Sequence, residues 1–190
     1  MEKINYIDNS EFYKREILDG KIIYHMLART EHADIVNNIS DVLKEFFKNN
    51  KNYSCKVYPG TLDLIIEDKQ KLIPDIMVVC DKTKFTKRGY EGAPELVVEV
   101  ISRSTLEYDF NRKKEIYEEL GVKEYWIVNP YSEDIQQYAI KDGKFKFISN
   151  YFIGEEEDDF SGEIYIKDIV KVNVFPELEV KVADIFYFDF

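Results

Sequence analysis

The feature that most constrains the fold of this chain is a short apolar run interrupted by one acid, Leu96-Val97-Val98-Glu99-Val100-Ile101. A run of this length and composition predicts a strand. Because apolar residues fall on both of its faces, the strand is expected at the centre of a sheet. A charged side chain in such a strand is costly unless it is paired or bound to a metal. Glu99 is therefore the first candidate functional residue.

Two further acids occupy comparable positions. Asp75 opens the apolar stretch Ile76 to Val79 and follows Pro74, which favours an extended backbone at the preceding residue. Asp63 lies inside Leu62-Asp63-Leu64-Ile65. If these strands are neighbours, the three carboxylates converge on one face of the sheet. The alternatives are a turn residue after proline for Asp75 and an outward-facing acid of an edge strand for Asp63.

The pattern along the rest of the chain predicts a single α/β domain over 1–190, a mixed sheet flanked by helices. The expected helices are Ser10 to Leu18, ending at Asp19-Gly20; one from an N-cap at Thr30 to the polar cluster of Lys48 to Asn52; one between the third and fourth central strands; Asp109 to Leu120, closed by Gly121; and a terminal turn. The expected strands are Lys21 to Leu27, Ser54 to Tyr58, Thr61 to Ile66, Ile73 to Cys80, Leu96 to Ile101, Tyr125 to Val128, a hairpin of Ile135 to Ile140 and Phe145 to Ile148 around Asp142-Gly143, Ile164 to Ile166 and Leu178 to Val182. The acidic run Glu155 to Asp159 is expected to be a solvated loop.

A lysine stands out on the helix that follows Glu99. At 100° per residue, Lys113 falls at the middle of the apolar stripe formed by Ile116, Tyr117 and Leu120. One interpretation is that its stem packs while its ammonium group reaches water. The other is that the ammonium group reaches the Glu99 carboxylate, which the presence of Glu99 just upstream favours.

The N-terminal part of the chain adds weaker candidates. His32 falls on the apolar face of the first long helix, one turn before its apolar residues begin. It is either a hydrogen-bonded core residue or part of a site at the helix N-terminus, where anions are favoured. Glu16 is a further candidate, whereas His25, inside a strand, is expected to be structural.

Together these residues predict a phosphodiesterase site. Acidic oxygens hold Mg²⁺ or Mn²⁺, the metal activates a bound water, and a lysine orients that water or stabilises developing charge. Other chemistries lack their motifs: the sequence has no GxSxG, GxxxxGK[ST], GxGxxG or HExxH.

Charge and composition limit the other classes. The formal net charge is −11, which opposes nucleic-acid binding, but the window Asp81 to Lys114 has eight basic and six acidic residues. Apolar runs fall short of a membrane span, and the N-terminus shows no secretory signal. Cys55 and Cys80, without CxxC spacing, are expected to be reduced thiols in a cytoplasmic protein.

An ordered series of segments resembles a known family. PDIMVVCDK, GAPELVVEVISRST and DFNRKKEIYEELGVKEYWIVNP, with EILDGKIIYHM and VYPGTLDLII upstream and VNVFPELEVKVADIF at the end, are similar to the Uma-type restriction-endonuclease family. That family is a branch of the PD-(D/E)XK nuclease superfamily. The resemblance covers nearly the whole chain and implies a restriction-endonuclease-like mixed sheet with a C-terminal hairpin region.

The resemblance also implies a site. It places the metal at Asp75 and Glu99, with Val100 as a third metal-site position, and Lys113 where the superfamily's lysine has moved from position 101 to the helix. Glu16, His32 and Asp63 match positions that border the site, and Arg103 departs from a usual proline. The implied function is Mg²⁺-dependent cleavage of DNA, with RNA as a second substrate class, by a homodimer that makes no membrane contact. A nuclease-fold module that binds nucleic acid or protein without cutting is the alternative, which the acidic charge and the absence of lysine at position 101 favour.

Overall fold

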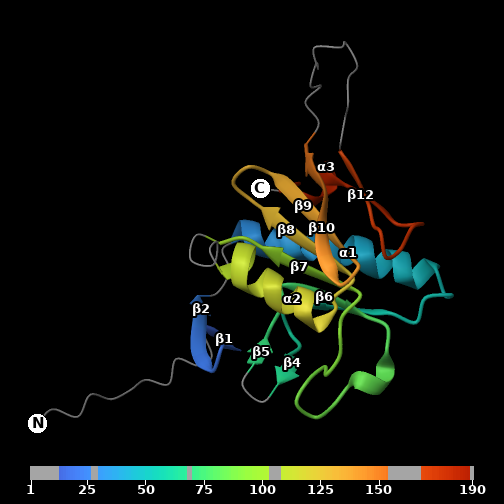
Figure 1. Cartoon of the computed structure of the whole chain (residues 1–190). Coiled ribbons are helices and arrows are strands. Elements are labelled where there is room, and N and C mark those ends of the chain that lie inside the picture. The colour runs from blue at the N-terminus through green and yellow to red at the C-terminus, as the bar shows by residue number, and fades with distance from the viewer. Residues whose placement is uncertain (1–12, 27–29, 68–69, 103–107, 154–167, 189–190) are drawn as a thin grey trace, which may run out of the picture.

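The computed structural model describes residues 13–26, 30–67, 70–102, 108–153 and 168–188. Its centre is a six-stranded sheet with the strand order β10-β9-β8-β7-β6-β3 (Figure 1). The strands are β3 (Lys56–Pro59), β6 (Ile76–Val79), β7 (Leu96–Val100), β8 (Glu124–Asn129), β9 (Asp134–Lys141) and β10 (Lys144–Phe152).

The sheet is mixed, as the sequence predicts. β7 and β8 run parallel, and every other neighbouring pair in this sheet is antiparallel. A parallel pair needs a crossover connection. Here the crossover contains a π-helical turn, η3 (Tyr108–Lys113), which continues into the α-helix α2 (Lys114–Leu120). Gly121 ends α2 with φ 85°, in agreement with its predicted C′ role.

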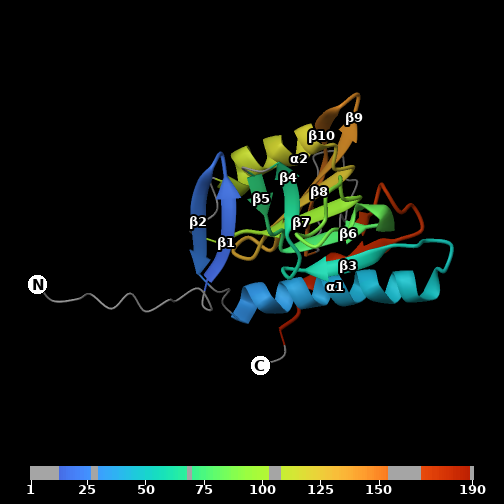
Figure 2. The same cartoon turned by 90° about the horizontal axis from the view of Figure 1, so that it is seen from below.

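The two faces of this sheet are covered by different layers. Helix α1 (Thr30–Asn49) lies along one face and α2 along the other (Figure 2). On β7, Val98 and Val100 belong to the core under α1, while Val97 belongs to the core under α2. Because side chains alternate along a strand, Glu99 shares the α2 face with Val97.

The C-terminal segment covers part of the α1 face. It consists of β11 (Ile169–Lys171), β12 (Glu179–Lys181) and the short helix α3 (Val182–Ile185). Asn38 of α1 donates hydrogen bonds from Nδ2 to the carbonyls of Ile185 and Tyr187, both at 3.0 Å. β12 and α3 confirm the strand predicted at 178–182 and the predicted terminal turn of helix.

A second sheet stands beside the first, with the order β2-β1-β5-β4. Its strands are β1 (Tyr13–Leu18), β2 (Lys21–Met26), β4 (Leu64–Glu67) and β5 (Gln70–Leu72). The predicted helix at 10–18 is wrong: residues 13–18 are extended, and residues 10–12 lie outside the described residues. Asp19 and Gly20 have φ of 49° and 75° and form the turn of a β1–β2 hairpin.

Most other predicted elements are confirmed, with shifted ends. The helix expected between the third and fourth strands is only the 3-10 turn η2 (Lys82–Lys84). The structure also contains one strand that the sequence did not indicate, β5. The acidic run at 155–159 and the strand at 164–166 lie outside the described residues. Of the helices in the described part of the chain, none has the length and apolar content of a bilayer-spanning segment.

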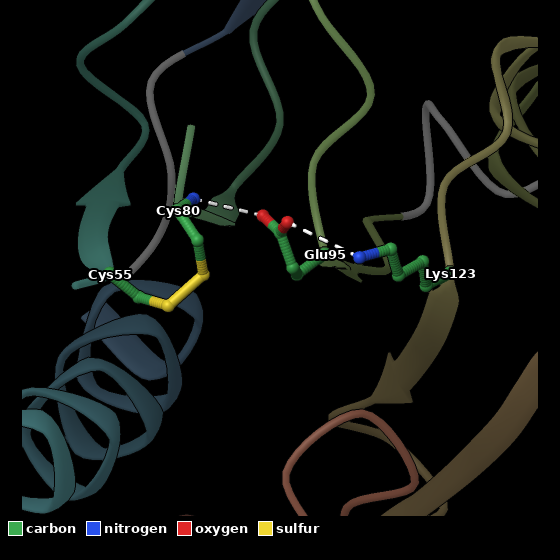
Figure 3. The surroundings of a disulfide bond; sticks show 4 residues. All are labelled: Cys55, Cys80, Glu95 and Lys123. Atoms are coloured by element: carbon green, nitrogen blue, oxygen red, sulfur yellow. Dashed lines mark hydrogen bonds and ion pairs between the residues drawn. A yellow bond between two sulfur atoms is a disulfide. The ribbon is translucent and has the colours of Figure 1, made fainter. Parts of the chain in front are cut away.

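Cys55 and Cys80 form a disulfide, so the prediction of two reduced thiols is wrong. Cys55 precedes β3 and Cys80 follows β6, and the antiparallel register that pairs Lys56 with Val79 places the two cysteines opposite each other. Their Cα atoms are 4.0 Å apart. The backbone N–H of Cys80 also donates to Glu95 Oε2 at 2.9 Å, and Glu95 forms an ion pair with Lys123 (Figure 3).

Candidate active site

Five elements bring polar side chains together at one end of β7. They are β1, the start of α1, the residue before β6, β7 itself, and the η3–α2 helix. The central group is Glu99, whose side chain is almost fully buried among apolar neighbours. Its Oε1 atom accepts hydrogen bonds from Lys113 Nζ at 3.1 Å and from the Tyr117 hydroxyl at 2.6 Å.

The helix presents both of these donors because of their spacing. Lys113 and Tyr117 are four residues apart and so lie one turn above the other on the same helical face. The sequence-based interpretation that Lys113 reaches Glu99 is confirmed as geometry: its side chain is 3% exposed, so the ammonium group does not extend into bulk solvent. Burial and the nearby Glu99 carboxylate hold the pKa of Tyr117 well above its ordinary value, so its hydroxyl keeps the proton that it donates.

Lys113 also links the two sheets. Its Nζ atom lies 3.3 Å from Glu16 Oε2, and Glu16 is buried on β1 of the smaller sheet. The other oxygen of Glu16 accepts a hydrogen bond from the backbone N–H of Ile73 at 2.8 Å. One ammonium group therefore bridges two buried carboxylates, each of which has a further donor to hold its orientation.

Asp75 is the third carboxylate of the cluster. Its Oδ1 atom accepts from Lys14 Nζ at 2.9 Å, and its Oδ2 atom accepts from the backbone N–H of Val100 at 3.0 Å. The contact with Val100 places Asp75 beside the residue that follows Glu99. Burial by itself would raise the pKa of Asp75, but Lys14 and His32 outweigh it and hold the pKa well below its ordinary value.

His32 approaches Asp75 from the first turn of α1. Its Nε2 atom lies 3.2 Å from Asp75 Oδ2. Its Nδ1 atom is buried and has no hydrogen-bond partner among the described residues. His32 therefore lines the site at the helix N-terminus, the second of the two places expected for it.

Two residues of the cluster were not predicted. Tyr117 was assigned to the apolar stripe of its helix, and its hydroxyl gives no signal in the sequence. Lys14 lay in the segment assigned to a helix; on a strand it alternates with Arg15 and shares a face with Glu16. Burial would lower the pKa of Lys14, but Asp75 and then Glu99 hold the pKa above its ordinary value, so the side chain is charged.

Other candidates lie apart or outside the described residues. Asp63 forms an ion pair with Lys71 of β5 at 2.9 Å, and it lies immediately before β4 of the smaller sheet, not on the face that carries Glu99. Three acids do converge as expected, but the third member beside Asp75 and Glu99 is Glu16, not Asp63. The side chain of His25 and the whole of Arg103 are not among the described residues.

The donors that this cluster offers to a metal are carboxylate oxygens. Within the described residues, no group of three or more His, Cys, Asp or Glu side chains is arranged to hold a metal by itself. Mg²⁺ is commonly bound by one or two carboxylates and completes its shell with water and substrate phosphate oxygens. Asp75 and Glu99, with three carboxylates set against two ammonium groups in the cluster, fit that mode of binding.

Two proteins of known sequence are similar to this chain. The uncharacterized protein sll1609 of Synechocystis sp. is 27% identical over 148 residues, which cover 76% of this chain and 82% of that protein. The uncharacterized protein slr1290 of the same organism is 30% identical over 141 residues, 73% of this chain and 72% of that protein.

A solved structure has the same fold. It is the crystal structure of a putative nuclease belonging to DUF820 from Anabaena variabilis ATCC 29413. The two structures superpose with a TM-score of 0.68, covering 90% of this chain and 89% of that one, at 17% sequence identity. This likeness shows a nuclease-like fold.

A family model matches most of the chain. The match covers residues 4–160, which include β1 with Glu16, the start of α1, β6, β7 and the helix that carries Lys113. The resemblance noted in the sequence is thereby confirmed. The chain belongs to the Uma2 family, whose model is described as "Putative restriction endonuclease".

Proposed function

We propose that this protein is a metal-dependent endonuclease that hydrolyses phosphodiester bonds of DNA. The observation that carries the proposal is the buried Lys113 ammonium group, 3.1 Å from Glu99 and 3.3 Å from Glu16, with Asp75 held beside it by the Val100 N–H. A lysine and several acids buried together at a strand end are costly for folding. Such an arrangement is typical of a site retained for chemistry.

The residues divide the work in a simple way. Asp75 and Glu99, with Val100 beside them, would hold Mg²⁺ or Mn²⁺, which supplies an activated water and shields phosphate charge when it is bound. Lys113 is placed to orient the attacking water or to stabilise charge on the scissile phosphate. Glu16 and Tyr117 hold Lys113 and Glu99 in position. We also propose that two copies act together as a homodimer, an arrangement that would let both strands of a duplex be cut.

The test is cleavage of supercoiled plasmid and of single-stranded DNA in Mg²⁺ and in Mn²⁺. Glu99→Gln keeps the shape of the side chain and removes its charge, so we expect its rate to fall by about 10²-fold or more. The matched control is Glu124→Gln. Glu124 is equally buried and lies on the next strand, but its carboxylate faces the α1 side of the sheet. It should cut at the wild-type rate.

Two outcomes would count against the proposal. Equal cleavage by wild type and Glu99→Gln would point to a contaminating nuclease. No cleavage by wild type in either metal would favour the second candidate, a nuclease-fold module that binds without cutting. The absence of lysine at position 101 favours that candidate, and the ion pairs of Arg88 and Arg112 with acids of the chain itself favour a protein as its partner. Retention of labelled DNA or RNA in EDTA would instead identify a module that binds nucleic acid.

A further inference from the structure

The site contains a second lysine, Lys14, that differs from Lys113 in its exposure and in its close contacts. Lys113 is 3% exposed and bridges two buried carboxylates from within the core. Lys14 is 21% exposed and has one short contact, to Asp75 at 2.9 Å, with Glu16 farther away at 4.0 Å. Lys14 therefore lies at the rim of the cluster, where its long side chain can turn toward water.

Asp75 has both of its oxygens engaged. Oδ2 is fixed by the backbone N–H of Val100, which belongs to a central strand, and by His32 at the start of a long helix. Oδ1 is engaged by Lys14 alone among the described residues. The contact made by a flexible side chain is the one that can be given up without moving a strand or a helix.

A divalent cation on Asp75 would lie within a few ångströms of the Lys14 ammonium group. Two positive charges at such a distance repel each other, the more strongly the less water lies between them. The two cations therefore compete for the same oxygen. Lys113 is in a different position, because its charge is matched by two carboxylates rather than one.

We propose that Lys14 is an internal counter-ion of Asp75 that the metal displaces on binding. The inference rests on the metal site of the proposed function. While the site holds no metal, Lys14 compensates the charge of Asp75 and keeps its carboxylate in place. When the metal binds, Lys14 leaves for solvent, and the affinity of the site is lowered by the cost of breaking this ion pair.

The sign of one measurement separates this role from a supporting one. If Lys14 competes with the metal, its removal strengthens metal binding. If Lys14 only orients Asp75 for the metal, its removal weakens metal binding. We expect Mn²⁺ to bind Lys14→Met about tenfold more tightly than wild type, the scale of one close ionic contact in a partly hydrated site.

The experiment is isothermal titration calorimetry of the full chain with MnCl₂ alone, without nucleic acid, at one fixed low ionic strength. Lys14→Arg keeps the competing charge and should bind Mn²⁺ as wild type does. The matched control is Lys71→Met, because Lys71 has the same 2.9 Å contact with an aspartate and a similar exposure of 25% but lies outside the site. Its Mn²⁺ affinity should be unchanged. A thermal unfolding midpoint for each variant shows that the titrated protein is folded.

Failure of this inference differs from failure of the proposed function. Asp75→Asn should abolish Mn²⁺ binding. If it does, and Lys14→Met binds Mn²⁺ equally or more weakly than wild type, Lys14 is not a competitor and only this inference is overturned. If wild type binds no Mn²⁺, or if Asp75→Asn binds it normally, the metal site itself is wrong and both proposals fall. Tighter binding by Lys71→Met as well would trace the effect to net charge and also overturn the role of Lys14.

Discussion

Two buried glutamates lie on neighbouring strands of the same sheet and face opposite sides of it. Glu99 on β7 has a lysine and a tyrosine for partners, inside a cluster that reaches the surface through Lys14 and His32. Glu124 on β8 accepts hydrogen bonds from Trp126 Nε1 at 2.7 Å and Gln137 Nε2 at 2.6 Å, both neutral. Burial is the same in both places, so it is the kind of partner that distinguishes them.

The partners of Glu124 give this buried glutamate a structural role. Its second oxygen accepts the backbone N–H of Val174 at 2.9 Å, and Gln137 also donates to the carbonyl of Lys171. Glu124 therefore fastens the C-terminal segment to the sheet. Glu99, by contrast, lies in a cluster of charged side chains, in which Lys113 joins it to Glu16 of the smaller sheet.

The largest expected effect comes from removing the cation that Glu99 has and Glu124 lacks. Lys113→Met leaves two buried carboxylates without their shared counter-charge, so we expect the free energy of unfolding to fall by about 3–5 kcal/mol. Urea denaturation measures it. Adding Glu99→Gln to this variant should recover part of the loss. A loss below about 1 kcal/mol would mean that the ion pair is no stronger than a surface pair.

Metal should stabilise one side of the comparison only. At a Mg²⁺ concentration about 100 times the dissociation constant, wild type should gain about 2.7 kcal/mol of stability, and EDTA should remove the gain. Glu124→Gln should show the same gain, whereas Glu99→Gln should lose most of it. Thermal unfolding with and without Mg²⁺ tests this. An equal gain in both variants would place the metal elsewhere.

A matched pair of tyrosines sharpens the comparison further. The Tyr117 hydroxyl donates to the Glu99 carboxylate at 2.6 Å, and the Tyr151 hydroxyl donates to the neutral side-chain oxygen of Gln137 at 2.8 Å. Hydrogen bonds to charged groups contribute more. Tyr117→Phe should therefore cost about 1.5–3 kcal/mol and Tyr151→Phe about 0.5–1.5 kcal/mol. The reverse order in urea denaturation would contradict an ionised Glu99.

The smallest expected effect is a difference in the slope of stability against pH. Burial raises the pKa of Glu124, only partly opposed by its hydrogen bonds, so the folded state holds this proton more tightly than the unfolded state. Its contribution to stability is greatest below the ordinary glutamate pKa of about 4.3 and falls as pH rises through the folded value. The stability of Glu124→Gln relative to that of wild type should therefore increase as the pH rises.

Asp75 should show the opposite sign. Its pKa is lowered in the folded state, so its contribution is present above the ordinary aspartate pKa of about 3.9 and is lost as pH falls through the folded value. Asp75→Asn should therefore be less stable than wild type near neutral pH, and this difference in the free energy of unfolding should disappear in acid. Urea denaturation at a series of pH values measures both variants. Curves parallel to wild type in either variant would contradict the corresponding shift.

Two Asp-Gly turns show where sequence reasoning succeeds and where it fails. Asp142-Gly143 was assigned correctly because the flanking residues have strand patterns. Asp19-Gly20 forms the same kind of turn, but the strand before it has Lys14 and Glu16 on its inward face, and these charges hide the alternation. Local rules are broken most often at functional sites. The charged residues that β1 contributes to the site are therefore the reason why this strand was not predicted.

The site residues that could be predicted from the sequence are those whose burial costs the most free energy. Glu99 and Lys113 stand out because a charge inside an apolar strand or stripe must be compensated. Lys14 gave no such signal once its segment was assigned to a helix. The disulfide could not be predicted either, because Cys55 and Cys80 are 25 positions apart in sequence and their contact depends on the register between β3 and β6.

That disulfide gives the chain a topological property. The segment between Cys55 and Cys80 is a closed covalent ring that contains β4, β5 and Asp75. A single proteolytic cut inside the ring leaves the polypeptide in one piece until the disulfide is reduced. A nick in the β4–β5 hairpin would therefore be silent on a non-reducing gel and visible as two fragments after reduction, and the tether would keep the N-terminal fragment, which carries Glu16, linked to the fragment that carries Asp75 and Glu99.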